Sequence, residues 1–263
     1  MVNIRRMALA AFVAAMIVTG CSSSRSQEPV VRVDPELANL SKEEIFDRAE
    51  AQYAAKKWSR ARRYYGHVYE SNPNDPLGRR SLLRIADTYF QHGDPVNLVE
   101  AQYKYRDFVN RYPASEQADY AMLQIAMVAH KQMEPPDRDQ TKTHEAIDKF
   151  NEMMVAYPNS PLRAQAEKGL QEALDRLATH DHLVARFYLR RGNALAALGR
   201  LNYLVETYPN FVDRDEVFYD LGRTLEKLGR QAEARLYYER VIAEYPDSEW
   251  AGDARDKLED LSA

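Results

Sequence analysis

The sequence of 263 residues contains a single cysteine, Cys21, and this scarcity excludes two kinds of stabilisation. One thiol can form neither an intramolecular disulfide nor the paired cysteine ligands of a structural zinc site. Gly-rich phosphate loops and serine-nucleophile motifs are also missing, and of the six histidines only those in "HDH" (His180–His182) cluster. Two histidines spaced i,i+2 diverge by about 200° on a helix, so we interpret this pair as a polar helix start. We predict no enzymatic activity, no cofactor and no metal.

An excess of basic residues is missing too. The 36 Lys and Arg residues face 40 Asp and Glu residues, which gives a formal net charge of −4. Setting aside Arg5 and Arg6, which belong to the leader described next, lowers the net charge to −6. Nucleic-acid binding depends on cations that neutralise phosphates. The composition therefore predicts no nucleic-acid partner.

The leader, residues 1–20, contains the apolar run "MALAAFVAAMIVTG" (Met7–Gly20), which follows Arg5 and Arg6. This run is too short to span a bilayer comfortably, and it ends in small residues directly before Cys21. The arrangement resembles a bacterial lipobox and predicts a lipoprotein signal peptide, with a covalent lipid on Cys21. An ordinary secretory signal with a chance cysteine is the alternative. By analogy with lipoprotein sorting, Ser22 after the cysteine favours the outer membrane.

The next segment, residues 21–40, is polar and contains Pro29 and Pro35 without any helical apolar stripe. We predict a lipidated N-terminus followed by a flexible tether. A flexible chain of 19 residues has a root-mean-square span of about 25 Å. That length would hold a folded body away from the membrane surface.

From Ser41 onward one helical segment recurs five times. Each copy has an alanine, larger side chains four and seven residues later, and a proline twelve residues later. Spacings of four and seven place three side chains on one helix face, and proline ends the helix. The copies are Ala61, Tyr65, Val68 and Pro73; Ala101, Tyr105, Phe108 and Pro113; Ala146, Phe150, Met153 and Pro158; Ala197, Leu201, Leu204 and Pro209; Ala234, Tyr238, Val241 and Pro246.

The alanines recur at intervals of 40, 45, 51 and 37 residues. This pattern predicts an all-α superhelical solenoid of about five tetratricopeptide-like helix pairs. We divide it into N-terminal repeats (41–113), a third repeat with an insertion (114–158), and C-terminal repeats with an end helix (159–263).

The same sequence also predicts how the helices are connected. We expect insertions around His92–Glu100 and Met133–Thr141, and a separate helix at Pro161–Ala178 before the fourth pair. Serines after the prolines are good helix caps, and proline suits the first helical position. We therefore expect Ser115, Ser160 and Ser248 to be N-caps, with Pro161 at the first helical position.

Three stretches go beyond what a generic repeat requires: "DRDQT" (Asp137–Thr141), "YPNS" (Tyr157–Ser160) and "VARFYLRRGNALAALGRL" (Val184–Leu201). With the lipobox, the tether and five repeats, they resemble the BamD family over essentially the whole mature chain. That family comprises lipoprotein subunits of the bacterial β-barrel assembly machinery. The resemblance implies a non-enzymatic scaffold that is anchored by lipid to the outer membrane and faces the periplasm.

The resemblance also implies partners and contact residues. A BamA-type subunit would bind the C-terminal repeats, unfolded outer-membrane proteins would bind the N-terminal repeats, and other Bam lipoproteins are possible further partners. The family's interface arginine precedes the fourth Tyr-Pro tyrosine by eight residues, and here that position is Arg200. Asn72 replaces the tyrosine that the family commonly has before the first repeat's proline, which weakens any transfer of client contacts to that repeat. From first-helix positions of the second and third repeats, we take as candidate residues of the client-binding groove Arg84, Tyr89, Tyr120 and Gln124.

Other interpretations stay open for the single residues and for the whole chain. Each groove candidate could equally be a core or solvated residue, and Arg200 could be an ordinary exposed arginine. The whole chain could instead be another periplasmic repeat adaptor for envelope maintenance or cell division, such as the Tol–Pal-associated type. That type typically carries a coiled-coil segment, and no sustained heptads are visible in this sequence.

Overall fold

A computed structural model describes residues 36–37 and 39–262. The predicted signal peptide, Cys21 and nearly all of the predicted tether lie outside the described residues. The chain divides into the units Met1–Asn39 and Leu40–Ala263, and every described helix lies in the second. The second unit contains eleven α-helices, and no strand occurs in the described part of the chain. Among the described helices, none combines the length and the apolarity that a bilayer crossing requires.

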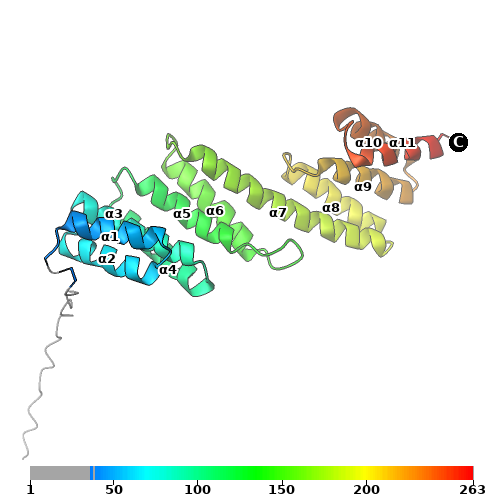
Figure 1. Ribbon diagram of the computed structural model, residues 1–263. Helices are drawn as coiled ribbons and strands as arrows, with labels where there is room; N and C mark the ends of the chain where they lie inside the picture. The colour runs from blue at the N-terminus through cyan, green and yellow to red at the C-terminus, as the bar shows by residue number, and fades with distance from the viewer. Residues whose placement is uncertain (1–35, 38, 263) are drawn as a thin grey trace, which may run out of the picture. The chain divides into compact units, whose positions relative to one another are not determined.

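The helices pack in chain order, each mainly against the one before and the one after it (Figure 1). This arrangement confirms the predicted all-α solenoid of five helix pairs, with α11 as the end helix. The pairs are α1 (Lys42–Ala54) with α2 (Trp58–Ser71), α3 (Pro76–His92) with α4 (Pro95–Arg111), α5 (Ala118–Lys131) with α6 (Thr141–Ala156), α7 (Arg163–Arg190) with α8 (Ala194–Thr207), and α9 (Arg214–Lys227) with α10 (Gln231–Glu244); α11 spans Glu249–Asp260.

The repeated side chains form the core between the helices. All five alanines, and all ten larger residues four and seven places after them, are at most 1 % exposed. Close packing leaves little room around the larger rings: a Cβ added at Gly222 would lie 2.5 Å from the Tyr238 ring. One at Gly169 would lie 2.3 Å from the Phe150 ring. Each of these aromatic side chains therefore needs a glycine on the facing helix.

The residue before each repeat proline ends the second helix of its pair. These C-caps are Asn72 for α2, Tyr112 for α4, Tyr157 for α6, Tyr208 for α8 and Tyr245 for α10. Each has left the α region, as expected before proline, and its N–H donates to the carbonyl of the residue seven places after the repeat alanine. The repeated spacing thus sets both the core and the helix end.

The prediction of a separate helix at Pro161–Ala178 is wrong. α7 runs without a break from Arg163 to Arg190 and joins that segment to the first helix of the fourth pair. No glycine or proline separates Ala178 from Val184, so nothing in the sequence ends the helix there. The "HDH" motif accordingly lies within α7 and is not a helix start.

The expected insertion at His92–Glu100 is also wrong. Only Gly93 and Asp94 separate α3 from α4: Gly93 takes a left-handed φ of 78°, and Asp94 caps α4 through the N–H groups of Val96 and Asn97. The extra residues lengthen both helices to 17 residues. At Met133–Thr141, by contrast, the predicted connecting loop between α5 and α6 is confirmed.

Of the three predicted serine caps, Ser248 is confirmed, and its side chain accepts the N–H of Trp250. Ser115 and Ser160 instead precede short turns, and α5 and α7 begin at Ala118 and Arg163. Pro161 lies in such a turn and does not occupy the first helical position. Both corrections move the helix start by two residues.

Candidate interaction sites

The first candidate site is a cluster of polar side chains between the first three helix pairs, which we call the Asp87 cluster. It consists of Glu50, Arg84, Asp87, Tyr105 and Tyr120. Arg84 donates to both carboxylate oxygens of Glu50, at 2.7 and 2.5 Å, and to Asp87 Oδ2 at 3.3 Å. Asp87 Oδ1 accepts the hydroxyls of Tyr105 at 2.7 Å and Tyr120 at 2.8 Å. The cluster connects α1, α3, α4 and α5.

Burial determines the electrostatics of this cluster. Asp87 is only 5 % exposed, and burial raises the pKa of its carboxyl despite the two tyrosine hydroxyls and Arg84. At Glu50 burial is the largest influence and acts to raise the pKa, but the hydrogen bonds and positive charges of neighbouring groups, those of Arg84 foremost, together outweigh it, so the pKa lies below its usual value. Arg84 therefore interacts chiefly with Glu50. Its guanidinium also lies 4.7 Å from the ring centre of Tyr53.

The other two groove candidates lie outside the Asp87 cluster. Tyr89 is half-buried on α3, with the Arg62 guanidinium 4.2 Å from its ring centre. Gln124 is half-buried on α5. Arg84 and Tyr120 are thus brought together through Asp87, whereas Tyr89 and Gln124 are not part of that cluster. The assignment of all four as client contacts stays a prediction.

The second candidate site is an open cavity of about 600 Å³ beside Arg200, which we call the Arg200 cavity. Arg200 is half-exposed on α8 and donates to Asp181 Oδ1 at 3.4 Å. The hydroxyl of Tyr208 donates to Asp181 Oδ2, also at 3.4 Å. Both distances are long for hydrogen bonds, so these contacts are weak. The cavity is lined by Gln140, His144, Leu177, His180, Asp181, Ala196, Gly199, Arg200, Tyr203 and Tyr208.

The α5–α6 loop supplies one wall of the Arg200 cavity through "DRDQT". Gln140 Nε2 donates to the carbonyls of Pro135 at 2.8 Å and Arg138 at 3.1 Å, and its Oε1 accepts the hydroxyl of Thr143. His180 on α7 lies 2.6 Å from the Pro136 carbonyl through Nδ1. These bonds hold the loop in one conformation against α7. Two of the distinctive sequence stretches therefore meet at this cavity.

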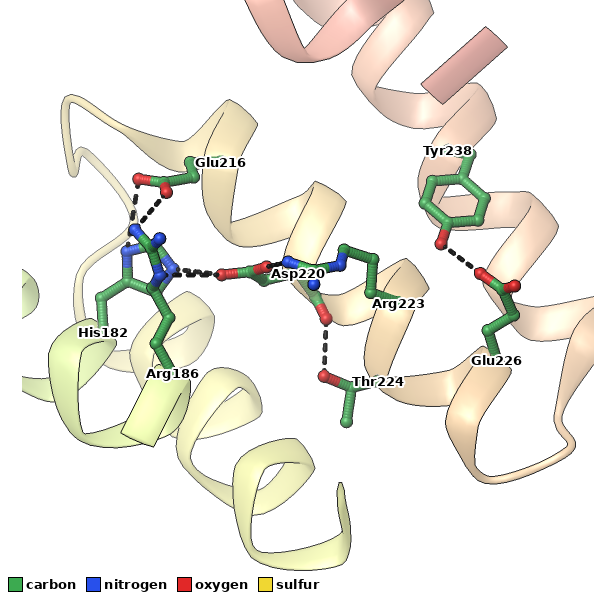
Figure 2. A network of polar contacts seen from close by, with 8 residues as sticks. All are labelled: His182, Arg186, Glu216, Asp220, Arg223, Thr224, Glu226 and Tyr238. Atoms are coloured by element: carbon green, nitrogen blue, oxygen red, sulfur yellow. Dashed lines mark hydrogen bonds and ion pairs between the residues drawn. The ribbon is translucent and has the colours of Figure 1, made fainter. Parts of the chain in front are cut away.

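A third polar group joins the fourth and fifth pairs, and Figure 2 shows it at close range; we call it the Asp220 network. Buried His182 lies 2.9 Å from Asp220 Oδ2 through Nε2 and 3.7 Å from Glu216 through Nδ1. Arg186 donates to Glu216 at 2.6 Å, and Arg223 donates to Asp220 Oδ1 at 3.0 Å. The network thus links α7 to α9.

The donor atoms of His182, Glu216 and Asp220 lie within 4.8 Å of one another, close enough for a metal ion. Each carboxylate is already paired with an arginine, however, and two guanidinium groups would repel a cation at this place. His180 and His182 point to different partners, the Pro136 carbonyl and Asp220, as their i,i+2 spacing predicted. We interpret the Asp220 network as a structural link between repeats.

Sequence reasoning missed the acidic centres of all three groups. Asp87 and Asp220 each stand in an apolar stretch, "LLRIADTYF" and "VFYDLG", and an acid at such a position was a usable signal. Their partners lie far away in the chain: Tyr120 is 33 residues from Asp87, and His182 is 38 residues from Asp220. Only the fold brings them together.

Comparison with known proteins finds relatives that match most of this chain. An outer membrane protein assembly factor BamD from Rickettsia prowazekii is 24% identical over 92% of this chain and 92% of its own length. The BamD of Caulobacter vibrioides is 25% identical over 96% of this chain and 80% of its own length. Among solved structures, the TPR2AB domain of yeast Sti1 in complex with pHSP90 is 15% identical over 84% of this chain and 89% of that chain, with a TM-score of 0.45.

The match to a protein family covers most of the folded chain. The family model YfiO, described as an outer membrane lipoprotein, matches residues 38–237. This stretch includes the Asp87 cluster, the Arg200 cavity and the Asp220 network. The resemblance to BamD proteins that the sequence predicted is confirmed at the level of the family. The chain belongs to the YfiO family of outer membrane lipoproteins.

Proposed function

We propose that this chain is a non-catalytic receptor and scaffold lipoprotein of an outer-membrane β-barrel assembly machinery. Its C-terminal repeats bind a BamA-type subunit, and its N-terminal repeats bind segments of unfolded outer-membrane proteins. A lipid on Cys21 anchors it to the outer membrane, where it faces the periplasm. Relatives named outer membrane protein assembly factor BamD, matched over most of this chain, support the assembly role.

The observation that carries the proposal is the convergence of two distinctive stretches on the Arg200 cavity. Gln140 comes from "DRDQT" and Arg200 from "LAALGRL", and both line the same cavity. Among the described residues Arg200 makes a single long polar contact, with Asp181, so its guanidinium keeps donors for a partner's carboxylate. Tyr203, which is 48 % exposed beside it, adds an aromatic contact surface of the kind found at interaction hot spots.

The fold suits the binding of an unfolded client as well. Stacked helix pairs create an extended surface that can hold a peptide along its length without requiring the peptide to fold. In the first three pairs, hydrogen bonds between repeats, such as those of the Asp87 cluster, keep this surface rigid. A rigid surface loses less entropy when a flexible peptide binds.

Affinity purification of the tagged full-length protein from detergent-solubilised membranes tests the proposal. We expect a BamA-type β-barrel subunit to be recovered with it. Recovery of other envelope proteins, without any β-barrel assembly subunit, would favour the alternative of an adaptor in envelope maintenance or cell division. An unrelated lipoprotein with the same tag is the control for non-specific capture.

The lipid anchor has its own test. Replacement of Cys21 by alanine removes the acceptor thiol, so we expect the protein to leave the membrane fraction. Several acyl chains hold a protein on a membrane far longer than one does. Continued membrane association of the Cys21→Ala protein would mean that something other than a lipid on this residue holds it there.

A further inference from the structure

The charges of the folded unit are unevenly distributed along the chain. Residues 41–113 carry thirteen Lys and Arg residues against ten Asp and Glu residues, whereas residues 114–263 carry nineteen against twenty-seven. The first two helix pairs are therefore basic, and the remainder of the unit is acidic. Net charge of one sign on one part of a molecule steers that part toward surfaces of the opposite sign.

The basic residues are densest in "KKWSRARR" (Lys56–Arg63), which forms the α1–α2 turn and the first turns of α2. No acidic residue occurs between Glu50 and Glu70. Lys56, Lys57 and Arg60 are exposed, and none of the three is within ion-pair distance of an acidic side chain in the described part of the chain. Exposed cations elsewhere are often paired within their own helix, as Arg163 is with Glu167 and Arg240 with Glu244.

These cations surround a hollow. A cavity of about 500 Å³ lies at the end of the first helix pair, and it is lined by Lys56, Lys57, Trp58, Ser59, Arg60 and His92. Lys56 has a positive φ of 56°, a conformation that is uncommon for a residue other than glycine and that the turn maintains. No side chain caps α2, so its first N–H groups add their partial positive charge to the same place. Trp58 is half-buried, with its ring 5.2 Å from that of Tyr53.

Asp94 lies on the adjacent α3–α4 turn, but its carboxylate already has hydrogen-bond partners. Asp94 lies 2.5 Å from His92 Nδ1, and its other oxygen accepts the N–H groups of Val96 and Asn97 at the start of α4. The hydrogen bonds from Asn97 are the main reason that the pKa of Asp94 lies at about 2. Its charge therefore serves α4 and leaves the three cations of the first turn unpaired.

We propose that the α1–α2 turn is a docking site for the phosphate groups of anionic phospholipids at a membrane surface. Lysine and arginine provide the attraction to phosphate, and a half-buried tryptophan suits the headgroup region. The absence of acids over nineteen residues and the aromatic side chain among the cations favour a lipid surface over an acidic peptide. The site belongs to the first repeat, which directly follows the predicted tether. The proposal goes beyond the assembly role and does not depend on lipid at Cys21.

Vesicle sedimentation of the chain from Ser22 onward, which retains every described residue and lacks Cys21, tests this proposal. We expect binding to vesicles of phosphatidylcholine with phosphatidylglycerol, and not to vesicles of phosphatidylcholine alone. Each cation near a membrane surface strengthens binding about fivefold, so replacing Lys56, Lys57 and Arg60 together by glutamine should weaken binding about 100-fold. Added salt should weaken wild-type binding by screening the same charges.

A matched variant distinguishes this site from net charge alone. Replacing Lys168, Arg190 and Arg255, which are exposed in the C-terminal half, by glutamine changes the net charge equally. We expect this variant to bind anionic vesicles within about twofold of wild type, because its substitutions leave the α1–α2 turn unchanged. Equal losses in the two triple variants, or no preference of wild type for anionic vesicles, would overturn the proposal.

Fluorescence shows whether the turn itself meets the lipid. The chain has two tryptophans, Trp58 and Trp250, so a Trp250→Phe protein reports on Trp58 alone. We expect its emission to shift to shorter wavelength when anionic vesicles are added. An unchanged spectrum on bound vesicles would contradict contact at this turn. If an acidic unfolded peptide causes the shift and vesicles do not, the occupant is a protein chain and the lipid proposal is wrong.

Discussion

Asp87 in the second helix pair and Asp181 in the fourth are both buried, and each has an arginine and a tyrosine as neighbours. Asp87 accepts two tyrosine hydroxyls at 2.7 and 2.8 Å, whereas the contacts of Asp181 with Arg200 and Tyr208 are both 3.4 Å. The arginines differ in the same way, since the side chain of Arg84 is 26% exposed and that of Arg200 is 49% exposed. Similar residues thus make a closed cluster in one region and an open one in the other.

The difference has a physical consequence for binding. The donor and acceptor of a hydrogen bond at ideal distance are already satisfied, so a binding partner gains little free energy by competing for that donor. A half-exposed arginine with one long contact retains donors for a partner's carboxylate, at little cost to the fold. The Asp87 cluster is therefore suited to joining repeats, and the Arg200 cavity is suited to meeting another protein.

The largest expected effect concerns the stability of the closed cluster. Asp87→Ala leaves the hydroxyls of Tyr105 and Tyr120 without an acceptor, and each unsatisfied buried group costs about 1–3 kcal/mol. We expect the free energy of unfolding to fall by about 3 kcal/mol, partly offset by the removal of a buried charge. Asp181→Ala should cost about 1 kcal/mol or less, because its bonds are long. Urea denaturation followed by circular dichroism measures both, and equal losses would contradict the distinction.

Next in size is the effect of Arg200→Glu on partner binding. The substitution places a second acid beside Asp181 and repels a carboxylate on the partner, so we expect affinity for a BamA-type subunit to fall about 100-fold. Stability should change by less than about 1 kcal/mol, because the arginine is half-exposed. Isothermal titration calorimetry with the purified partner gives the affinity. Arg190→Glu, a reversal at an exposed arginine of α7, is the control. Unchanged binding by the Arg200→Glu protein would mean that the contact implied by the resemblance is absent.

The same contrast explains how much the sequence alone could predict. The core followed from spacing, because residues four and seven places apart share a helix face wherever the helix lies. Arg200 was assigned by resemblance, and its position beside the cavity agrees with an accessible role without testing it. The bonds of Asp87 could not be predicted, because they depend on which helices stack together over 33 residues of chain. The repeat pattern led us to expect a helix end near Ala178. The residues there include no glycine or proline, so α7 continues.

A smaller effect is a dependence of stability on pH with a defined sign. Burial raises the pKa of Asp87 in the folded protein above its unfolded value of about 3.9, so the folded state binds the proton more tightly. Ionisation of the Asp87 carboxyl therefore makes folding less favourable at neutral pH than it would be with the carboxyl protonated, and this penalty is relieved as the pH falls through the raised pKa. Relative to Asp87→Asn, the wild type should gain stability as the pH is lowered from 7 toward 4.

Asp75 provides a comparison of opposite sign for that experiment. The hydrogen bond from Lys42 holds the pKa of Asp75 below its usual value, so its contribution to stability is lost as the pH falls through the folded pKa. Relative to Asp75→Asn, the wild type should therefore lose stability on acidification. Slopes of the same sign in the two pairs, measured by urea denaturation across pH, would rule out the raised pKa at Asp87.

The smallest expected effect isolates one hydroxyl in each region. Tyr120→Phe removes a 2.8 Å bond to Asp87 and leaves a more poorly solvated carboxylate, so it should cost about 1 kcal/mol. Tyr208→Phe removes only a 3.4 Å contact to Asp181 and should cost less than about 0.5 kcal/mol. If Tyr208→Phe proves as costly in urea denaturation, Asp181 is bonded as firmly as Asp87. The Arg200 cavity would then be a closed structural cluster, and a partner would have to break its bonds in order to bind there.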